Sequence, residues 1–363
     1  MRNQLLVASA LLSILQAVLF VAPARAQSGG KKPGTVKPKA PAKPPAKPTG
    51  PIVLGTTQLP GDFGKIGTTY TIGKSYPINF TLRSADYSVV PVTLGQNTWV
   101  PKASEKVLLL HYTVHNPMPR EQRYYWADIG FTAVDAKGIN HNFIQAVARE
   151  GEREPLTIQL KPAQKLDVVT AIIVPAEGVV PKLIVERERG APVIRYDLRG
   201  VVTPLPAGFA DPADSTGATA RQEVPAQAGT FYATGVLDMR LDEIAYVNGP
   251  LIKREPGDGK RFLTAIFTIK NRTASQQRYV WSDFAPDLRD ADGEKVAYNQ
   301  SILKASRDES TDGTLEPGEE TRIRFYFALP KDVAGKTLRL AEGRLSSARV
   351  FAWDLTTMVA KTP

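Results

Sequence analysis

Two stretches of the chain carry nearly the same string of aromatic, basic and acidic residues. The first, QRYYWADIGF, runs from Gln122 to Phe131, and the second, QRYVWSDFAP, runs from Gln277 to Pro286. Aromatic faces with polar groups at their rims are common in surfaces that stack against sugars or dock proteins. The candidate ligand-binding residues are therefore Arg123, Tyr125, Trp126, Asp128, Arg278, Trp281 and Asp283.

The same string could instead serve the fold. In an alternating strand, Trp126 and Asp128 share one face while Ile129 takes the other, and after a bulge Trp126 could cover the open edge of a core. Tryptophan and tyrosine are often mostly buried with the polar tip hydrogen-bonded. The sequence leaves both interpretations open, although a ligand would meet different residues at Tyr125 and at its counterpart Val280.

Metal binding is the next chemistry to consider, because the histidines are few and close together. His111 and His115 are four residues apart in an expected strand, and His141 follows in the next strand or loop. Residues four apart along a strand are separated by roughly 13 Å, too far for one ion. The stretch DADGE, from Asp290, resembles the start of a calcium loop, but an aspartate turn closed by glycine explains it better, because the first copy has DAKGI there and the rest of an EF-type loop is absent. We predict no metal site and no cofactor.

The chain also lacks the familiar signatures of catalysis. It contains no GxSxG, HExxH or GxxxxGK[ST] motif. Without cysteine it has neither disulfides nor a thiol nucleophile. No catalytic residue is assigned, and we expect the protein not to be an enzyme. A secreted or periplasmic envelope enzyme with an unrecognised carboxylate site remains an alternative.

The two strings belong to a longer internal repeat. At an offset of 155 residues, residues 107–175 align without a gap with residues 262–330. A period of this length indicates the duplication of a whole domain. The alignment pairs Asn116 with Asn271, Trp126 with Trp281, Asp135 with Asp290, Gly138 with Gly293, Pro162 with Pro317 and Pro175 with Pro330.

Hydrophobic residues in both copies alternate with a period of two. Such alternation is typical of a strand with one face on a core, and no stretch of the mature chain has the pattern of an amphipathic helix. We predict an all-β protein of two tandem antiparallel immunoglobulin-like β-sandwiches. The alternating positions are Ile78, Phe80 and Leu82; Leu108, Leu110, Tyr112 and Val114; Val168, Thr170, Ile172 and Val174; Leu263, Ala265, Phe267 and Ile269; and Ile323, Phe325, Phe327 and Leu329.

The order of the motifs resembles that of a known family. Both copies have a strand ending in asparagine (TVHN, TIKN), an aromatic-Asp-apolar step (WADI, WSDF), an Asp-x-x-Gly turn, KPA or EPGE, and a strand ending in proline (IIVP, FALP). This order is similar to that of immunoglobulin-like domains of unknown function in bacterial exported proteins and lipoproteins, which are related to a mycobacterial immunoprotective extracellular protein. The resemblance implies a β-sandwich fold and supplies no catalytic residues. The chain departs from the lipoprotein members in having no cysteine to lipidate.

The N-terminal residues have the pattern of an export signal followed by a basic tether. Arg2, the apolar stretch from Leu5 to Val21 and the small-residue site at Ala24-Arg25-Ala26 are typical of a cleaved signal peptide. Residues 27–50 are rich in lysine and proline, which favours a disordered, extended linker. Contact with an anionic surface is possible through Lys31, Lys32, Lys37, Lys39, Lys43 and Lys47. We expect a secreted or periplasmic bacterial protein with no transmembrane span in the mature chain.

The formal charge of +10 does not indicate a nucleic-acid partner. Residues 1–50 hold eight basic and no acidic residues, which leaves 38 basic and 36 acidic residues in 51–363. The expected folded part is therefore almost neutral, whereas nucleic-acid binding requires a basic surface.

These observations predict six parts: a signal peptide (1–26), a Lys/Pro-rich linker (27–50), a first sandwich (51–198), an interdomain linker (199–229), a second sandwich (230–357) and a tail (358–363). We predict a non-catalytic binding or adhesion protein of the cell envelope that recognises a protein or glycan surface outside the cytoplasm. A structural assembly or spacer subunit, whose sheet edges pair with another protein, is a further alternative.

Overall fold

The computed structural model describes residues 54–56, 58, 62–343 and 347–361. The expected signal peptide, the Lys/Pro-rich linker and its six lysines lie outside these residues. The described residues form strands and three single-turn 3-10 helices, with no α-helix, which confirms the prediction of an all-β protein. Within the same residues, no helix has the length and apolar character needed to cross a membrane. The 3-10 helices are η1 (Trp126–Asp128), η2 (Trp281–Asp283) and η3 (Leu355–Thr357).

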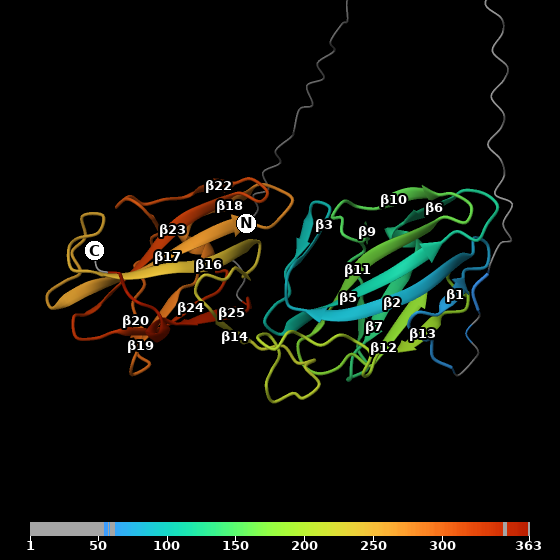
Figure 1. Ribbon diagram of the computed structural model, residues 1–363, viewed down its shortest axis with the longest axis horizontal. Helices are drawn as coiled ribbons and strands as arrows, with labels where there is room; N and C mark the ends of the chain where they lie inside the picture. Colours follow the sequence, from blue (N-terminus) through green and yellow to red (C-terminus); the bar gives the residue numbers. More distant parts are fainter. Residues whose placement is uncertain (1–53, 57, 59–61, 344–346, 362–363) are drawn as a thin grey trace, which may run out of the picture. The chain divides into compact units, whose positions relative to one another are not determined.

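The first sandwich has two antiparallel sheets that enclose one hydrophobic core (Figure 1). One sheet has the order β1 (Thr69–Ile72), β2 (Ile78–Ser88), β5 (Glu105–His115), β11 (Lys165–Pro175), β9 (Ala148–Arg149). The other has the order β13 (Ile194–Asp197), β12 (Lys182–Glu186), β7 (Gly130–Val134), β8 (Asn140–Asn142). Two short pairs complete it: β6 (Gln122–Tyr125) with β10 (Thr157–Leu160), and β3 (Val92–Leu94) with β4 (Asn97–Trp99).

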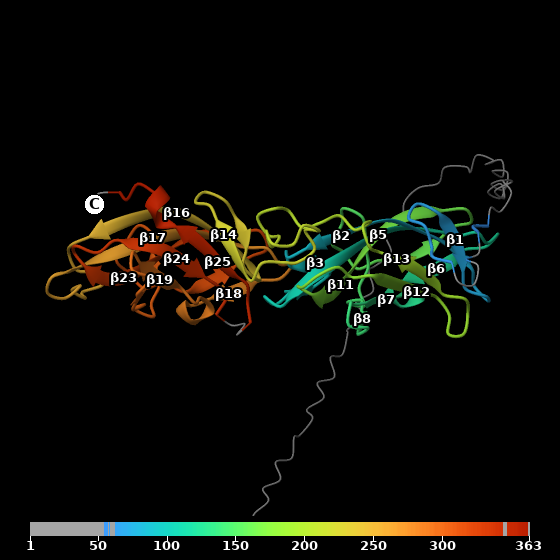
Figure 2. The ribbon, with the colours of Figure 1, turned by 90° about the horizontal axis from the view of Figure 1, so that it is seen from below.

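The second sandwich is drawn in yellow to red in Figures 1 and 2 and has the same plan. One sheet has the order β15 (Tyr232–Ala233), β16 (Leu237–Val247), β17 (Lys260–Asn271), β23 (Glu320–Pro330), β21 (Leu303–Lys304). The other has the order β14 (Glu223–Ala226), β25 (Val350–Asp354), β24 (Gly335–Leu340), β19 (Asp287–Asp290), β20 (Lys295–Val296). A short pair joins β18 (Gln277–Tyr279) to β22 (Gly313–Leu315). Only β14 pairs in parallel among the strands of these sheets, with β25.

The duplication predicted from the sequence extends to the pairing of strands. Tyr112 of β5 lies opposite Val168 of β11, and Phe267 of β17 lies opposite Ile323 of β23, which is the same register at the offset of 155. The face of each long strand that the alternation assigned to the core is buried in both sandwiches. The core is therefore built from two equivalent sets of strands. In the second sandwich β17 is buried on its other face as well, where Phe262 packs in a smaller cluster with Leu251, Leu303 and Tyr326.

A buried asparagine fixes the same corner of each sandwich. The Nδ2 of Asn116 donates to the carbonyl oxygens of Arg120 at 2.8 Å and Leu160 at 2.9 Å. Its Oδ1 accepts the backbone N–H of Met118 at 2.9 Å. One side chain thus joins the loop before β6 to the end of β10. The equivalent bonds of Asn271 join Ser275, Leu315 and Thr273.

A cation over a tyrosine ring closes one end of each sandwich. Lys106 is fully buried, and its Nζ lies 4.4 Å from the centroid of the Tyr87 ring. The Nζ also donates to the carbonyl oxygens of Ala176, Gly178 and Ala218. The lysine therefore joins the start of β5 to two turns that are distant in the sequence. In the second sandwich, Arg261 lies over Tyr246 at 3.8 Å and donates to the carbonyl of Val333 at 3.1 Å.

The segment expected to be an interdomain linker, residues 199–229, is folded. Leu205, Ala210, Ala218 and Ala220 are buried in the core of the first sandwich. The later part of the segment contains β14, which belongs to a sheet of the second sandwich. Its apolar residues show no period because they lie in turns that are hydrogen-bonded to one another and to β2. The pattern of the sequence therefore gave no sign of their burial.

Candidate functional site

The first aromatic string is divided between β6 and the 3-10 turn η1. The carboxylate of Asp128 accepts the backbone N–H of Tyr125 at 2.9 Å and so closes the turn. This turn interrupts the alternation of the strand. Trp126 is 42% exposed, whereas Ile129 and Tyr124 are buried. The expectation that Trp126 and Asp128 lie in an alternating strand is therefore wrong, because they form a 3-10 turn, and Trp126 lies at the surface.

The second string has the same geometry. Trp281 is 45% exposed, and Asp283 accepts the backbone N–H of Val280 at 2.7 Å. Tyr279, the counterpart of Tyr124, is buried. The two interpretations of the string thus apply to different residues: the first tyrosine packs in the core, the aspartate closes the turn, and the tryptophan is held at the surface.

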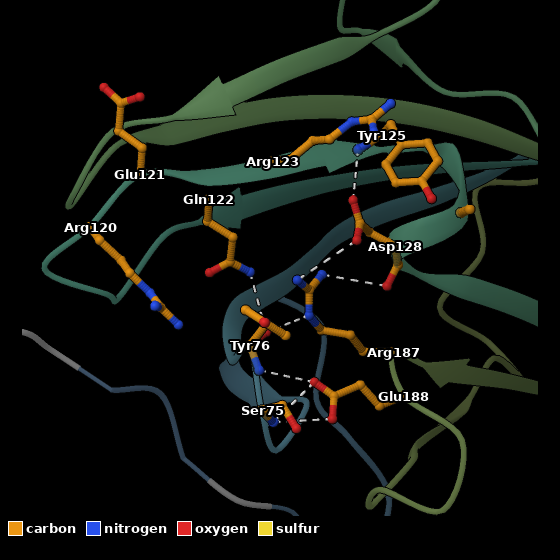
Figure 3. A pocket seen from close by; sticks show the side chains of 11 residues that line it. Ser75, Tyr76, Arg120, Glu121, Gln122, Arg123, Tyr125, Asp128, Arg187 and Glu188 are labelled. Atoms are coloured by element: carbon orange, nitrogen blue, oxygen red, sulfur yellow. Dashed lines mark hydrogen bonds and ion pairs between the residues drawn. The ribbon is translucent and has the colours of Figure 1, made fainter.

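A groove of about 700 Å³ lies beside the first string (Figure 3). This volume falls within the range of small-ligand sites. Arg123, Tyr125 and Asp128 line the groove, and the exposed ring of Trp126 meets the Tyr125 ring edge-on at 6.2 Å between centroids. The structure therefore brings four of the candidate residues together. The other lining residues are Ser75, Tyr76, Arg120, Glu121, Gln122, Ala127, Arg187 and Glu188.

Arg187 forms the floor of the groove. Its side chain is 4% exposed, and its Nη2 lies 3.9 Å from the Asp128 carboxylate. Its Nε donates to the carbonyl oxygen of Tyr76 at 2.6 Å. Burial lowers the pKa of Arg187, and burial raises the pKa of Asp128 against the opposing effects of the Tyr125 N–H and Arg187. The two charges offset each other, so the floor itself offers little net charge to a ligand.

Glu188 holds the loop that carries Tyr76. Its carboxylate accepts the backbone N–H groups of Lys74 at 3.0 Å, Ser75 at 3.1 Å and Tyr76 at 3.1 Å. Figure 3 shows the bonds to Ser75 and Tyr76. These bonds, with that of Ser75 the largest, lower the pKa of Glu188. The carboxylate therefore acts as a support for one wall of the groove.

Replacing Glu188 by glutamine should give a small, pH-dependent loss of stability. Because the folded-state pKa is lowered from 4.5, the contribution of Glu188 is present above pH 4.5 and is lost as the pH falls through the folded-state value. The difference in melting temperature between the wild type and Glu188→Gln should thus be present at pH 7 and vanish in acid. Glu186→Gln, an exposed neighbour on β12, is the control. A difference that persists unchanged in acid would contradict this role.

The rim of the groove presents two arginines that lie over tyrosine rings. The guanidinium of Arg120 is 5.6 Å from the centroid of Tyr76, and that of Arg123 is 4.4 Å from the centroid of Tyr125. Both arginines are exposed, and neither makes an ion pair in the described part of the chain. Their N–H groups are therefore available to a ligand.

The second sandwich does not reproduce this groove. The strand register places Ser275 and Val280 at the positions of Arg120 and Tyr125. The pairing of Thr132 with Ile184 in the first copy corresponds to the pairing of Asp287 with Arg339 in the second, again at an offset of 155. At this offset Glu342 takes the position of Arg187. The second sandwich therefore keeps Arg278, Trp281 and Asp283. It has no arginine at the position of Arg187 and no tyrosine at the position of Tyr125.

The histidines and the acidic turn serve local structure. The carboxylate of Asp290 accepts the backbone N–H groups of Asp292 and Glu294 inside its own turn. Among the described residues, no group of three or more His, Cys, Asp or Glu side chains is arranged to hold a metal ion. The histidine contacts are His111 with Asp86 and Glu150, His115 with Asn79, and His141 with Asp135.

The fold and the groove define a β-sandwich protein with an open polar site. A family described as a domain of unknown function, DUF4352, matches residues 248–350. No curated protein gives a significant match.

Several solved structures are similar to parts of the chain. An uncharacterised β-sandwich protein from Clostridium difficile is 17% identical with a TM-score of 0.29, and the match covers 37% of this chain and 93% of that one. MPT63, a secreted protein from Mycobacterium tuberculosis, is 15% identical with a TM-score of 0.28, over 36% of this chain and 97% of that one. A conserved hypothetical protein from Bacillus anthracis is 17% identical with a TM-score of 0.25, and the match covers 34% of this chain and 92% of that one.

Proposed function

We propose that this protein is a non-catalytic binding protein that works outside the cytoplasm and attaches to a protein or glycan surface of the cell envelope. The observation that carries the proposal is the exposure of Trp126 and Trp281, at 42% and 45%, at equivalent places in the two copies. Tryptophan is enriched in contact surfaces, where its ring packs against the partner and its N–H donates a hydrogen bond. The export pattern at the N-terminus supports the location.

The proposed mechanism is surface recognition by indole rings with polar neighbours. An exposed arginine precedes each tryptophan by three residues, Arg123 in the first copy and Arg278 in the second. A flat ring with a cation at its rim suits a sugar face or an aromatic protein side chain. Two copies on one chain would also strengthen attachment to a repetitive surface if both engage.

Replacing the two tryptophans should abolish retention on the envelope. We expect Trp126→Ala and Trp281→Ala each to weaken co-sedimentation of the full mature chain with an isolated envelope fraction, and the double variant to remove it. Because both rings are exposed, the melting temperature should change by no more than about 2 °C.

The matched control is Ile139→Ala, which removes another exposed apolar side chain from the first sandwich, 55% exposed, and should leave retention unchanged. Full retention of the double variant would refute the proposal. Unfolding of either single variant would instead show that its indole stabilises the fold.

A further inference from the structure

The groove of the first sandwich has donors that its own acids do not use. Of its acidic residues, Asp128 is bound to the Tyr125 N–H and to Arg187, and Glu188 is bound to the loop at Lys74 to Tyr76. In Figure 3, the carboxylate of Glu121 points away from Arg120. The lining charges balance formally, but the guanidinium N–H groups at the rim remain unbound to any carboxylate in the described residues.

The tyrosine rings prepare these arginines for an anion. Stacking on a ring occupies the flat face of a guanidinium and leaves its in-plane N–H groups free. Those groups form paired, charge-assisted bonds with a carboxylate. Arg120 over Tyr76 and Arg123 over Tyr125 therefore hold two such donor sets at the rim, and Tyr76 is itself 57% exposed.

A second polar requirement comes from Gln122. Its side chain is 7% exposed, and its Nε2 donates to the carbonyl oxygen of Tyr76 at 3.2 Å. Its Oε1 is buried and has no donor among the described residues. A buried acceptor left unpaired is unfavourable, so a ligand hydroxyl in the groove that Gln122 lines would gain a hydrogen bond once the amide turned to expose this oxygen.

We propose that this groove binds a carboxylate-bearing sugar of an acidic polysaccharide. Successive uronic acid rings combine the three features that the lining offers: one carboxylate for Arg120 and another for Arg123, hydroxyl donors for the Gln122 oxygen, and a flat face for the exposed ring of Tyr76. The proposal rests on the proposed function, because it names the ligand class of a site beside Trp126.

The second sandwich shows which substitutions in the groove are compatible with the fold. Arg120→Ser/Tyr125→Val gives the groove the residues that the folded second copy carries at these positions, Ser275 and Val280. The variant should therefore fold, and its melting temperature verifies this. Arg120→Ser alone changes only an exposed rim residue. Arg189→Ser, in the exposed loop that follows Glu188 and outside the lining, is the control.

Binding is measured by calorimetry on the full mature chain at low ionic strength with four probes: oligogalacturonate, a neutral dextran oligosaccharide, oligoglutamate and polyglycerol phosphate. Oligogalacturonate should bind at least about tenfold more tightly than the others, and the double variant should weaken it about tenfold or more. Arg120→Ser should give part of this loss, and Arg189→Ser none. Added salt should weaken the binding.

Unchanged affinity in the double variant overturns the proposal, as does equal binding of dextran, oligoglutamate or polyglycerol phosphate. A failure here is distinct from a failure of the proposed function. If the chain is retained on the envelope through Trp126 and Trp281 but does not bind oligogalacturonate, only the ligand class is wrong. If the chain is not retained at all, the proposed function fails whatever the saccharide result.

Discussion

Lys106→Met should destabilise the first sandwich by about 2–4 kcal/mol, because it leaves buried carbonyl groups without a donor. The lysine is fully buried, and its ammonium bonds the carbonyl oxygens of Ala176, Gly178 and Ala218. Methionine fills a similar volume, so the loss reports the polar contacts and the cation over the Tyr87 ring more than a cavity. A domain of this size should melt roughly 5–10 °C lower.

The control for this prediction is Lys102→Met. The side chain of Lys102 is 58% exposed and makes an ion pair at 3.5 Å with Glu105. An exposed ion pair of this kind contributes little to the stability of the folded protein, so the control should melt within about 1–2 °C of the wild type. If Lys106→Met melts as high as the control, the buried lysine does not hold these turns together.

Asn116→Ala and Asn271→Ala should each lower the free energy of unfolding of their own sandwich by about 2–4 kcal/mol. Each variant leaves backbone carbonyl groups in the corner without a donor. The two asparagines are 0% exposed and make equivalent sets of bonds. Asn116 bonds the carbonyl of Arg120, so its variant should also loosen the rim of the groove.

Hydrogen exchange of the full chain assigns the effect to one sandwich. Faster exchange should appear around β5, β6 and β10 in Asn116→Ala, and around β17, β18 and β22 in Asn271→Ala. Asn140→Ala, at an exposed edge position, should alter neither pattern. Uniform acceleration across both sandwiches in either variant would contradict the idea that the corners act locally.

The fold could be predicted because its core positions repeat with period two. Tyr112 and Phe267 are buried, as their alternating neighbours required. The burial of Lys106 could not be predicted, because a lysine at the start of a strand is normally exposed and its hydrogen-bond partners are up to 112 residues away in the sequence. The burial of Leu205 could not be predicted either, because residues in irregular turns have no period that marks their buried face.

The site could be predicted only in part. Arg123, Tyr125, Trp126 and Asp128 are neighbours in the sequence, so one string revealed them. Arg187 and Tyr76 reach the same groove from distant loops, and no local pattern links them to the string, whereas Arg120 lies only two residues before it. The exposure of Trp126 depended on a 3-10 turn closed by Asp128. An aspartate two residues after a tryptophan could have suggested such a turn, because aspartate readily accepts nearby backbone N–H groups.

Oxidative footprinting of tryptophan with and without the isolated envelope fraction tests most directly whether the duplicated strings make the contact. The chain has four tryptophans, and Trp353, 1% exposed, provides an unreactive internal reference. We expect Trp126 and Trp281 to oxidise readily in the free chain and to be protected when the envelope fraction is added. Unchanged oxidation of both, while the chain remains bound, would show that it attaches through a different surface.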